Sequence, residues 1–149
     1  MPKTYRLRLT RLLDAPRRRV FRAWADPNEM RRFLRPHEDW TTPSLRADAR
    51  VGGRYRLTMR APDGTTYATG GVYRVVKPYE RLTFTWTWED GHTAARFETE
   101  VTVLLRAEGA KTRLTLIHDL LPSAAERDGH REGWTGCLRC LRAHIEGGV

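Results

Sequence analysis

Apolar and polar residues alternate over much of the chain, which is the pattern of half-buried β-strands. The first such segment covers residues 4–10. Further strands are predicted over residues 53–60, 67–76, 82–88, 97–105 and 113–118. Short turns separate these later segments, so neighbouring strands should pair antiparallel. We predict irregular structure between Pro36 and Pro43.

Two short helices are predicted between the first strand and the others. Pro16 opens the first helix, and Val20 and Trp24 lie on its apolar face. Asp26 is placed to cap the second helix, with Pro27 at its first position. These two helices precede the main run of strands.

The last segment changes to a helical period. Ser123 begins a capping box, and an apolar stripe follows at helical spacing. The stripe consists of Trp134, Leu138, Leu141 and Ile145. Three glycines, at positions 129, 133 and 136, are unusual inside a helix, and they either weaken it or let another backbone approach closely.

These elements predict an α+β fold. It consists of a curved antiparallel sheet of about six or seven strands, two short helices after the first strand, and a long C-terminal helix. One face of the sheet is apolar, and only the C-terminal helix is long enough to cover it. The space between sheet and helix is the natural ligand site. We expect a single domain over residues 1–149.

Charge changes this picture little. The chain has 27 Lys and Arg against 18 Asp and Glu, a net charge of +9, and 24 of the basic residues are arginine. The arginines are scattered, and many fall on outward strand faces, which indicates a solvated surface with charge pairs. The sequence also has no apolar run of membrane length and no secretory signal. We expect a cytoplasmic protein without nucleic-acid or membrane partners.

The two cysteines form a CxxC motif, Cys137 to Cys140. They lie late in the predicted helix, away from the N-terminal dipole that lowers a thiol pKa. Zinc could recruit His144 and His130, but a second CxxC is missing. We therefore expect two packed thiols, no metal and no cofactor.

Several short motifs occur in a fixed order over nearly the whole chain. They are the segments 15–16, 20–24, 26–27, 51–55, 80–86, 101–103, 112–118 and 130–134. Their order and spacing resemble the SRPBCC, or START-like, superfamily. The closest resemblance is to the branch named after the C-terminal domain of the heat-shock-protein-90 ATPase activator.

The resemblance implies a helix-grip fold that often encloses an apolar cavity. It does not fix a function, because related folds bind lipids, sterols, polyketides or hormones, and some catalyse cyclisation or hydroxylation. The eukaryotic namesake stimulates a chaperone ATPase, but the N-terminal part of that activator has no counterpart here. A chaperone partner is therefore the less favoured expectation, and a homodimer stays open.

The inward strand positions and the helix stripe together define a candidate pocket. Its residues are Tyr55, Met59, Tyr73, Trp86, Trp88, Phe97, His118, Trp134 and Leu138. An aromatic wall of this kind would suit an apolar or aromatic small molecule, with Tyr and Trp polar groups orienting it. The same residues could instead form a filled core.

His118 is the residue in this set best suited to act as a general base near neutral pH. No catalytic partner is evident, because Asp119, Glu98 and Glu100 point to the opposite face. Small-molecule binding without catalysis is therefore the leading hypothesis. The alternatives are a cyclase or hydratase-type enzyme using His118 with a pocket tyrosine, and a protein-interaction module acting through its basic surface.

Overall fold

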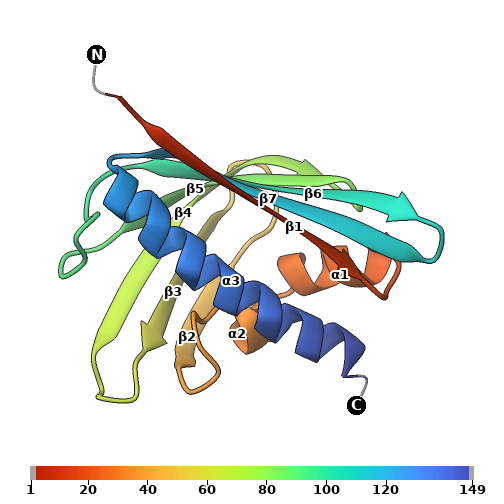
Figure 1. The fold of residues 1–149 in the computed structure, drawn as a ribbon, viewed down its shortest axis with the longest axis horizontal. Helices are drawn as coiled ribbons and strands as arrows, with labels where there is room; N and C mark the ends of the chain where they lie inside the picture. Colours follow the sequence, from red (N-terminus) through yellow and green to blue (C-terminus); the bar gives the residue numbers. More distant parts are fainter. Residues whose placement is uncertain (1–2, 148–149) are drawn as a thin grey trace.

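The computed structural model describes residues 3–147, which form a seven-stranded sheet and three helices (Figure 1). The strands are β1 (Tyr5–Leu13), β2 (Thr41–Ala47), β3 (Arg54–Arg60), β4 (Thr66–Lys77), β5 (Arg81–Trp88), β6 (Thr99–Glu108) and β7 (Lys111–Leu121). The helices are α1 (Arg17–Ala25), α2 (Pro27–Phe33) and α3 (Ala124–Glu146).

The sheet is antiparallel throughout, in the order β1-β7-β6-β5-β4-β3-β2. Strands β2 to β7 follow one another as a meander, and β1 pairs with β7 at the far edge. Figure 1 shows α3 lying across one face of the sheet, with α1 and α2 near its C-terminal half. The predicted α+β helix-grip arrangement is confirmed. None of the described helices combines the length and the apolarity needed to cross a membrane.

The edge strand β2 occupies part of the segment predicted to be irregular. It pairs with β3, yet only Thr42 among its residues is buried. Pro43 lies within it, which an edge strand tolerates because one side of its backbone makes no ladder hydrogen bonds. Backbone pairing with β3, and not burial of side chains, stabilises this strand. Its residues therefore show no apolar alternation that would have predicted it.

Phe97 corrects a second expectation. The alternation places it in phase with inward residues of β6, but the strand begins only at Thr99. Arg96 has a positive φ of 72°, and the Phe97 N–H donates to the Ala94 carbonyl oxygen. The backbone therefore turns before the strand starts, and Phe97 is 53% exposed instead of facing inward.

Both predicted N-cap hydrogen bonds form, but the return bond of the capping box is not found among residues 3–147, where the Glu126 carboxylate accepts from Thr93 instead. The Asp26 side chain accepts a hydrogen bond from the Asn28 N–H at 2.9 Å, and Ser123 Oγ accepts one from the Glu126 N–H at 3.1 Å. Such caps satisfy backbone donors that the first helical turn leaves free. The predicted stripe of α3 is buried in full, namely Trp134, Leu138, Leu141 and Ile145.

The outward strand faces carry ion pairs, as the arginine rows indicated. Arg6 pairs with Asp119 of the neighbouring strand at 2.6 Å, and Arg56 pairs with Glu89 at 2.7 Å. Both arginines are more than half exposed to solvent, so the pairs contribute little to stability. The basic charge of the chain thus lies mostly on its solvent side.

Gly136 brings α3 into direct backbone contact with the segment after α2. A Cβ at this position would lie 1.7 Å from the Pro36 carbonyl oxygen. Only glycine fits there, so the close approach expected for a helical glycine is realised. This contact fixes the middle of α3 against the N-terminal part of the chain.

Replacing Gly136 with alanine should destabilise the protein by about 1–3 kcal/mol, because the added methyl group overpacks a backbone contact. Gly129→Ala is the matched control on the same helix, since a Cβ there meets nothing within 4 Å. The control should gain up to about 1 kcal/mol from helix propensity. Urea unfolding measures both effects, and equal stabilities of the two variants would contradict the contact.

Candidate functional site

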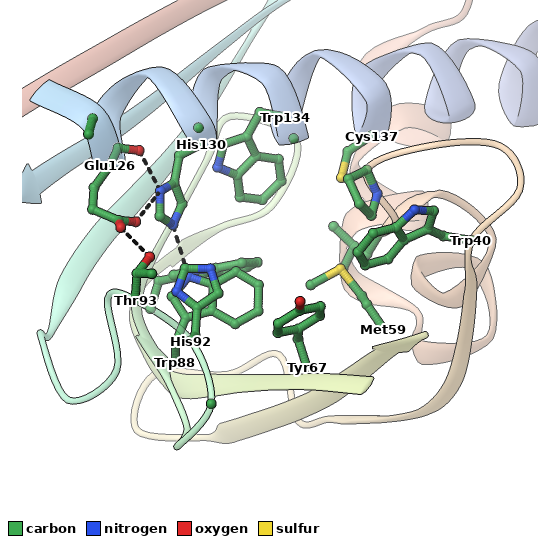
Figure 2. A pocket seen from close by; sticks show the side chains of 17 residues that line it. Trp40, Met59, Tyr67, Trp88, His92, Thr93, Glu126, His130, Trp134 and Cys137 are labelled. Atoms are coloured by element: carbon green, nitrogen blue, oxygen red, sulfur yellow. Dashed lines mark hydrogen bonds and ion pairs between the residues drawn. The ribbon is translucent and has the colours of Figure 1, made fainter. Parts of the chain in front are cut away.

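A cavity of about 440 Å³ lies between α3, strands β3 to β5 and two loops (Figure 2). The loops are residues 34–40 after α2 and residues 89–98 between β5 and β6. The lining includes the exposed residues Gly91, Ala125 and Gly129, so the cavity reaches the surface beside the first turns of α3. Its size is typical of sites that bind small molecules.

The walls of the cavity are mainly aromatic. Trp86 packs against Trp134 and Trp88, with ring centroids 5.1 and 5.5 Å apart. Trp40 stacks on Tyr67 at 6.0 Å on the opposite side. Figure 2 shows the polar residues gathered at one end of the cavity and Trp40 at the other. The site therefore has an apolar body and one polar end.

Four of the predicted pocket residues line this cavity, namely Met59, Trp86, Trp88 and Trp134. Tyr55 and Tyr73 face inward as predicted but lie deeper, at a separate void of only about 10 Å³. Burial raises the pKa of both phenols, and Tyr55 donates its hydroxyl proton to the Thr85 carbonyl oxygen. These tyrosines belong to the core and do not line the larger cavity.

The remaining three predicted residues also lie outside the cavity lining. Leu138 and His118 are buried in the core, and the exposed Phe97 was placed wrongly by the strand pattern. Alternation predicts which face of the sheet a side chain lies on. It does not predict whether neighbouring rings already fill the space on that face. His118 illustrates this, because Trp86 and Trp134 pack against its ring.

One face of α3 lines the cavity, and most of its residues were not predicted as part of the site. Seven residues of α3 at helical spacing line the cavity, namely Ala125, Glu126, Gly129, His130, Gly133, Trp134 and Cys137. Two of them are glycines, which leave room beside the helix. The recurrence of polar and small residues on one face was the signal available in the sequence. Trp40 and His92 add to the site from the loops, where no periodicity indicates direction. Tyr67 adds to it from β4, in phase with the inward Tyr73.

His118 is a neutral ring in a chain of buried hydrogen bonds. The Trp134 indole N–H donates to His118 Nδ1 at 2.9 Å. The ring proton must then lie on Nε2, which donates to Thr99 Oγ1 at 2.7 Å. Thr99 in turn donates to the Trp86 carbonyl oxygen. Burial lowers the pKa of His118 well below that of free imidazole, so the ring stays uncharged.

A second tryptophan–histidine pair lies next to the first. The Trp88 indole N–H donates to His130 Nε2 at 2.8 Å, which places the ring proton on Nδ1. His130 Nδ1 donates to the Glu126 carbonyl oxygen one turn earlier in α3. Burial lowers the pKa of His130 and keeps it neutral. The two pairs link β5 and β7 to the same helix.

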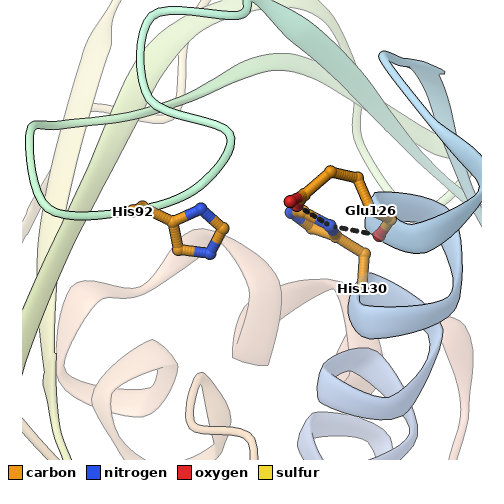
Figure 3. A group of neighbouring side chains, drawn as sticks. All are labelled: His92, Glu126 and His130. Carbon is orange, nitrogen blue, oxygen red and sulfur yellow. Dashed lines mark hydrogen bonds and ion pairs between the residues drawn. The ribbon is translucent and has the colours of Figure 1, made fainter.

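The polar end of the cavity consists of His92, Thr93, Glu126 and His130 (Figures 2 and 3). His92 stacks on Trp88 with centroids 4.1 Å apart, and its Nδ1 accepts the Ala94 N–H. The Thr93 hydroxyl donates to Glu126 Oε2 and so ties the 89–98 loop to α3.

The same cluster has the residue types of a metal site. Ligand atoms of His92, Glu126 and His130 lie within 4.8 Å of one another. Figure 3 shows the His92 side chain projecting from its loop toward His130 and Glu126 of α3. However, both ring nitrogens of His130 are engaged, by Trp88 and by the helix backbone. A metal ion would have to break one of these bonds, and the arrangement therefore favours hydrogen bonding over coordination.

The CxxC thiols are both free and buried. Burial raises the pKa of Cys137 and of Cys140, which disfavours the thiolate that redox chemistry and zinc binding require. His144, considered as a zinc partner, instead pairs with Glu29 at 2.9 Å. Cys137 contributes to the cavity wall as a small apolar group.

Stability should fall as the pH drops from about 7 to about 5, because the unfolded chain takes up a proton that folded His118 resists. Its folded pKa is lowered, so its contribution is complete above the ordinary imidazole pKa of about 6.5 and is lost below it. Each proton that is taken up on unfolding changes the free energy of unfolding by about 1.4 kcal/mol per pH unit. His118→Gln can keep an acceptor for Trp134 and a donor for Thr99 and should show a smaller slope in urea unfolding. Parallel curves for wild type and variant would contradict a neutral buried His118.

Comparison with known proteins gives a consistent picture. The chain is similar to a protein from Chromobacterium violaceum, with 30% identity, a TM-score of 0.83, and 95% of this chain and 96% of that chain covered. It is also similar to the AHSA1 protein from Silicibacter pomeroyi, with 28% identity, a TM-score of 0.86, and coverage of 97% and 100%. An AHSA1-like protein from Aeromonas hydrophila matches at 26% identity and a TM-score of 0.76, with 95% and 93% covered. The search of curated proteins gave no match.

The family comparison covers most of the chain. Residues 14–146 match the sequence model described as Activator of Hsp90 ATPase homolog 1-like protein. The match spans α1 to α3 and therefore includes every element that lines the cavity. The resemblance inferred from the motifs is confirmed, and the chain belongs to the Activator of Hsp90 ATPase homolog 1-like family within the SRPBCC superfamily.

Proposed function

We propose that this protein binds an apolar or aromatic small molecule in the cavity between α3 and the sheet. The observation that carries the proposal is a cavity of about 440 Å³ with aromatic walls and a single polar end. Flat aromatic surfaces favour ligands that can stack on them, and a few polar groups suffice to orient such a ligand.

Catalysis by His118 receives no support from the geometry. Both ring nitrogens are engaged in hydrogen bonds, and the side chain does not line the cavity. A general base must reach the proton that it removes, directly or through one water molecule. The cyclase or hydratase alternative would therefore need a different base.

The glycines of α3 offer a direct test, because a larger side chain there fills the cavity without leaving a hole in the core. Gly133→Leu should fold with at least wild-type stability, since a Cβ at this position only touches Pro36 at 3.9 Å. The added side chain should lower the affinity for the neutral fluorescent probe N-phenylnaphthylamine at least tenfold. Probe fluorescence measures binding, and thermal unfolding with and without probe checks that binding stabilises the fold.

Glu132→Leu is the control, because it introduces the same residue at the neighbouring, exposed position outside the cavity lining. It should bind the probe as the wild type does. Undiminished probe binding by a folded Gly133→Leu variant would place the ligand elsewhere and refute the proposal.

A further inference from the structure

The charge of the cavity differs in sign from that of the protein. The chain has a net charge of +9 and 24 arginines, yet the lining described for the cavity contains neither arginine nor lysine. Glu126 is the one carboxylate in that lining. Long-range repulsion from surface arginines is screened within about 8 Å at physiological salt, so the nearby carboxylate dominates inside the cavity.

The histidines beside Glu126 do not neutralise it. Burial is the largest cause that lowers the pKa of both His92 and His130, so both rings are uncharged at neutral pH. Their hydrogen bonds agree, because one nitrogen of each ring carries no proton and accepts a hydrogen bond, in His92 from the Ala94 N–H and in His130 from the Trp88 indole N–H. Among residues 3–147, the sole ion-pair contact of Glu126 is with this neutral His130, at 3.6 Å.

The Glu126 carboxylate also has unused hydrogen-bonding capacity. Oε2 accepts a hydrogen bond from Thr93, whereas Oε1 accepts none from the described part of the chain. The side chain is only 16% exposed, so bulk water solvates it poorly. A carboxylate in this state interacts strongly with a donor or cation that enters the cavity.

Aromatic rings form most of the cavity wall beyond this carboxylate and its two histidine neighbours. Trp88 stacks on His92 at the polar end, and the Tyr67 ring also contacts His92, with centroids 6.0 Å apart. Trp134 and, at the far end, Trp40 continue the wall (Figure 2). The faces of such rings attract organic cations, most strongly where water is excluded. A carboxylate and aromatic faces therefore favour the same kind of ligand, and both disfavour an anion.

We infer that the cavity selects a ligand with a flat apolar body and a single cationic amine group, which Glu126 binds as a charge-assisted hydrogen-bond acceptor. This inference rests on the proposed function and adds the charge of the ligand to it. A metal ion is the competing cation, but it would have to displace a bond at His130, whereas an ammonium group needs only Glu126 Oε1.

Three probes with one aromatic body but different charges test the inference: naphthylmethylammonium, naphthylmethanol and naphthoate. Calorimetric titration of the wild type in buffer with EDTA should rank the cation about tenfold above the neutral alcohol, with the anion weakest. Glu126→Gln can still accept from Thr93, and it should lower the affinity for the cation far more than the affinity for the alcohol, so that the two probes bind about equally. Glu132→Gln makes the same change of net charge at an exposed position of α3 and should behave as the wild type.

The outcomes separate the two proposals. Equal binding of all three probes would leave small-molecule binding intact but overturn the inference about charge. A preference for the cation that survives in Glu126→Gln would also overturn it. Absence of binding by these probes and by N-phenylnaphthylamine would refute both. In the absence of EDTA, zinc could bind more tightly than the ammonium probe and lose this binding in His92→Ala. That result would make the cluster a metal site and contradict the inference.

Discussion

The buried hydrogen bond from the Trp134 indole to His118 fixes how α3 sits over the sheet. Trp134 projects from the helix and His118 from β7, and each ring is fully or almost fully buried. A second bond of the same kind joins Trp88 of β5 to His130 of the helix. An apolar interface would close until its side chains touched, whereas directional bonds between large rings hold a defined separation. The cavity lies beside these two bonds, because Trp88, His130 and Trp134 are part of its lining.

The glycines of α3 complement these bonds for two different reasons. Gly136 lies against the Pro36 carbonyl oxygen, where any side chain would collide with backbone. Gly129 and Gly133 have space in front of them, and that space is part of the cavity. At position 136, glycine thus permits a close backbone contact in the middle of α3. At positions 129 and 133, it leaves space for the cavity beside the first half of the helix.

The sequence predicts the fold better than the site, and particular residues show why. Alternation indicated five of the strands between α2 and α3, but not β2, which is an edge strand with little burial to leave a pattern. Within the site, the strand residues Met59, Trp86 and Trp88 follow from the period of two. His92 lies in a loop, and its direction is set by stacking on Trp88, a contact that no local pattern encodes. Whether an inward residue borders a cavity or a filled core also depends on rings from other elements, as His118 of β7 shows, because Trp86 of β5 and Trp134 of α3 pack against it.

The separation of charge between surface and cavity follows from the position of Glu126. Most partly buried carboxylates take an arginine or lysine as partner, and this chain has many arginines to offer. Glu126 instead lies in the first turn of α3, where the free N–H groups and the helix dipole stabilise a negative charge. The Thr93 hydroxyl adds one further donor. Because backbone and hydroxyl groups stabilise the carboxylate, the fold needs no basic residue in the cavity, and one carboxylate oxygen stays available to a ligand.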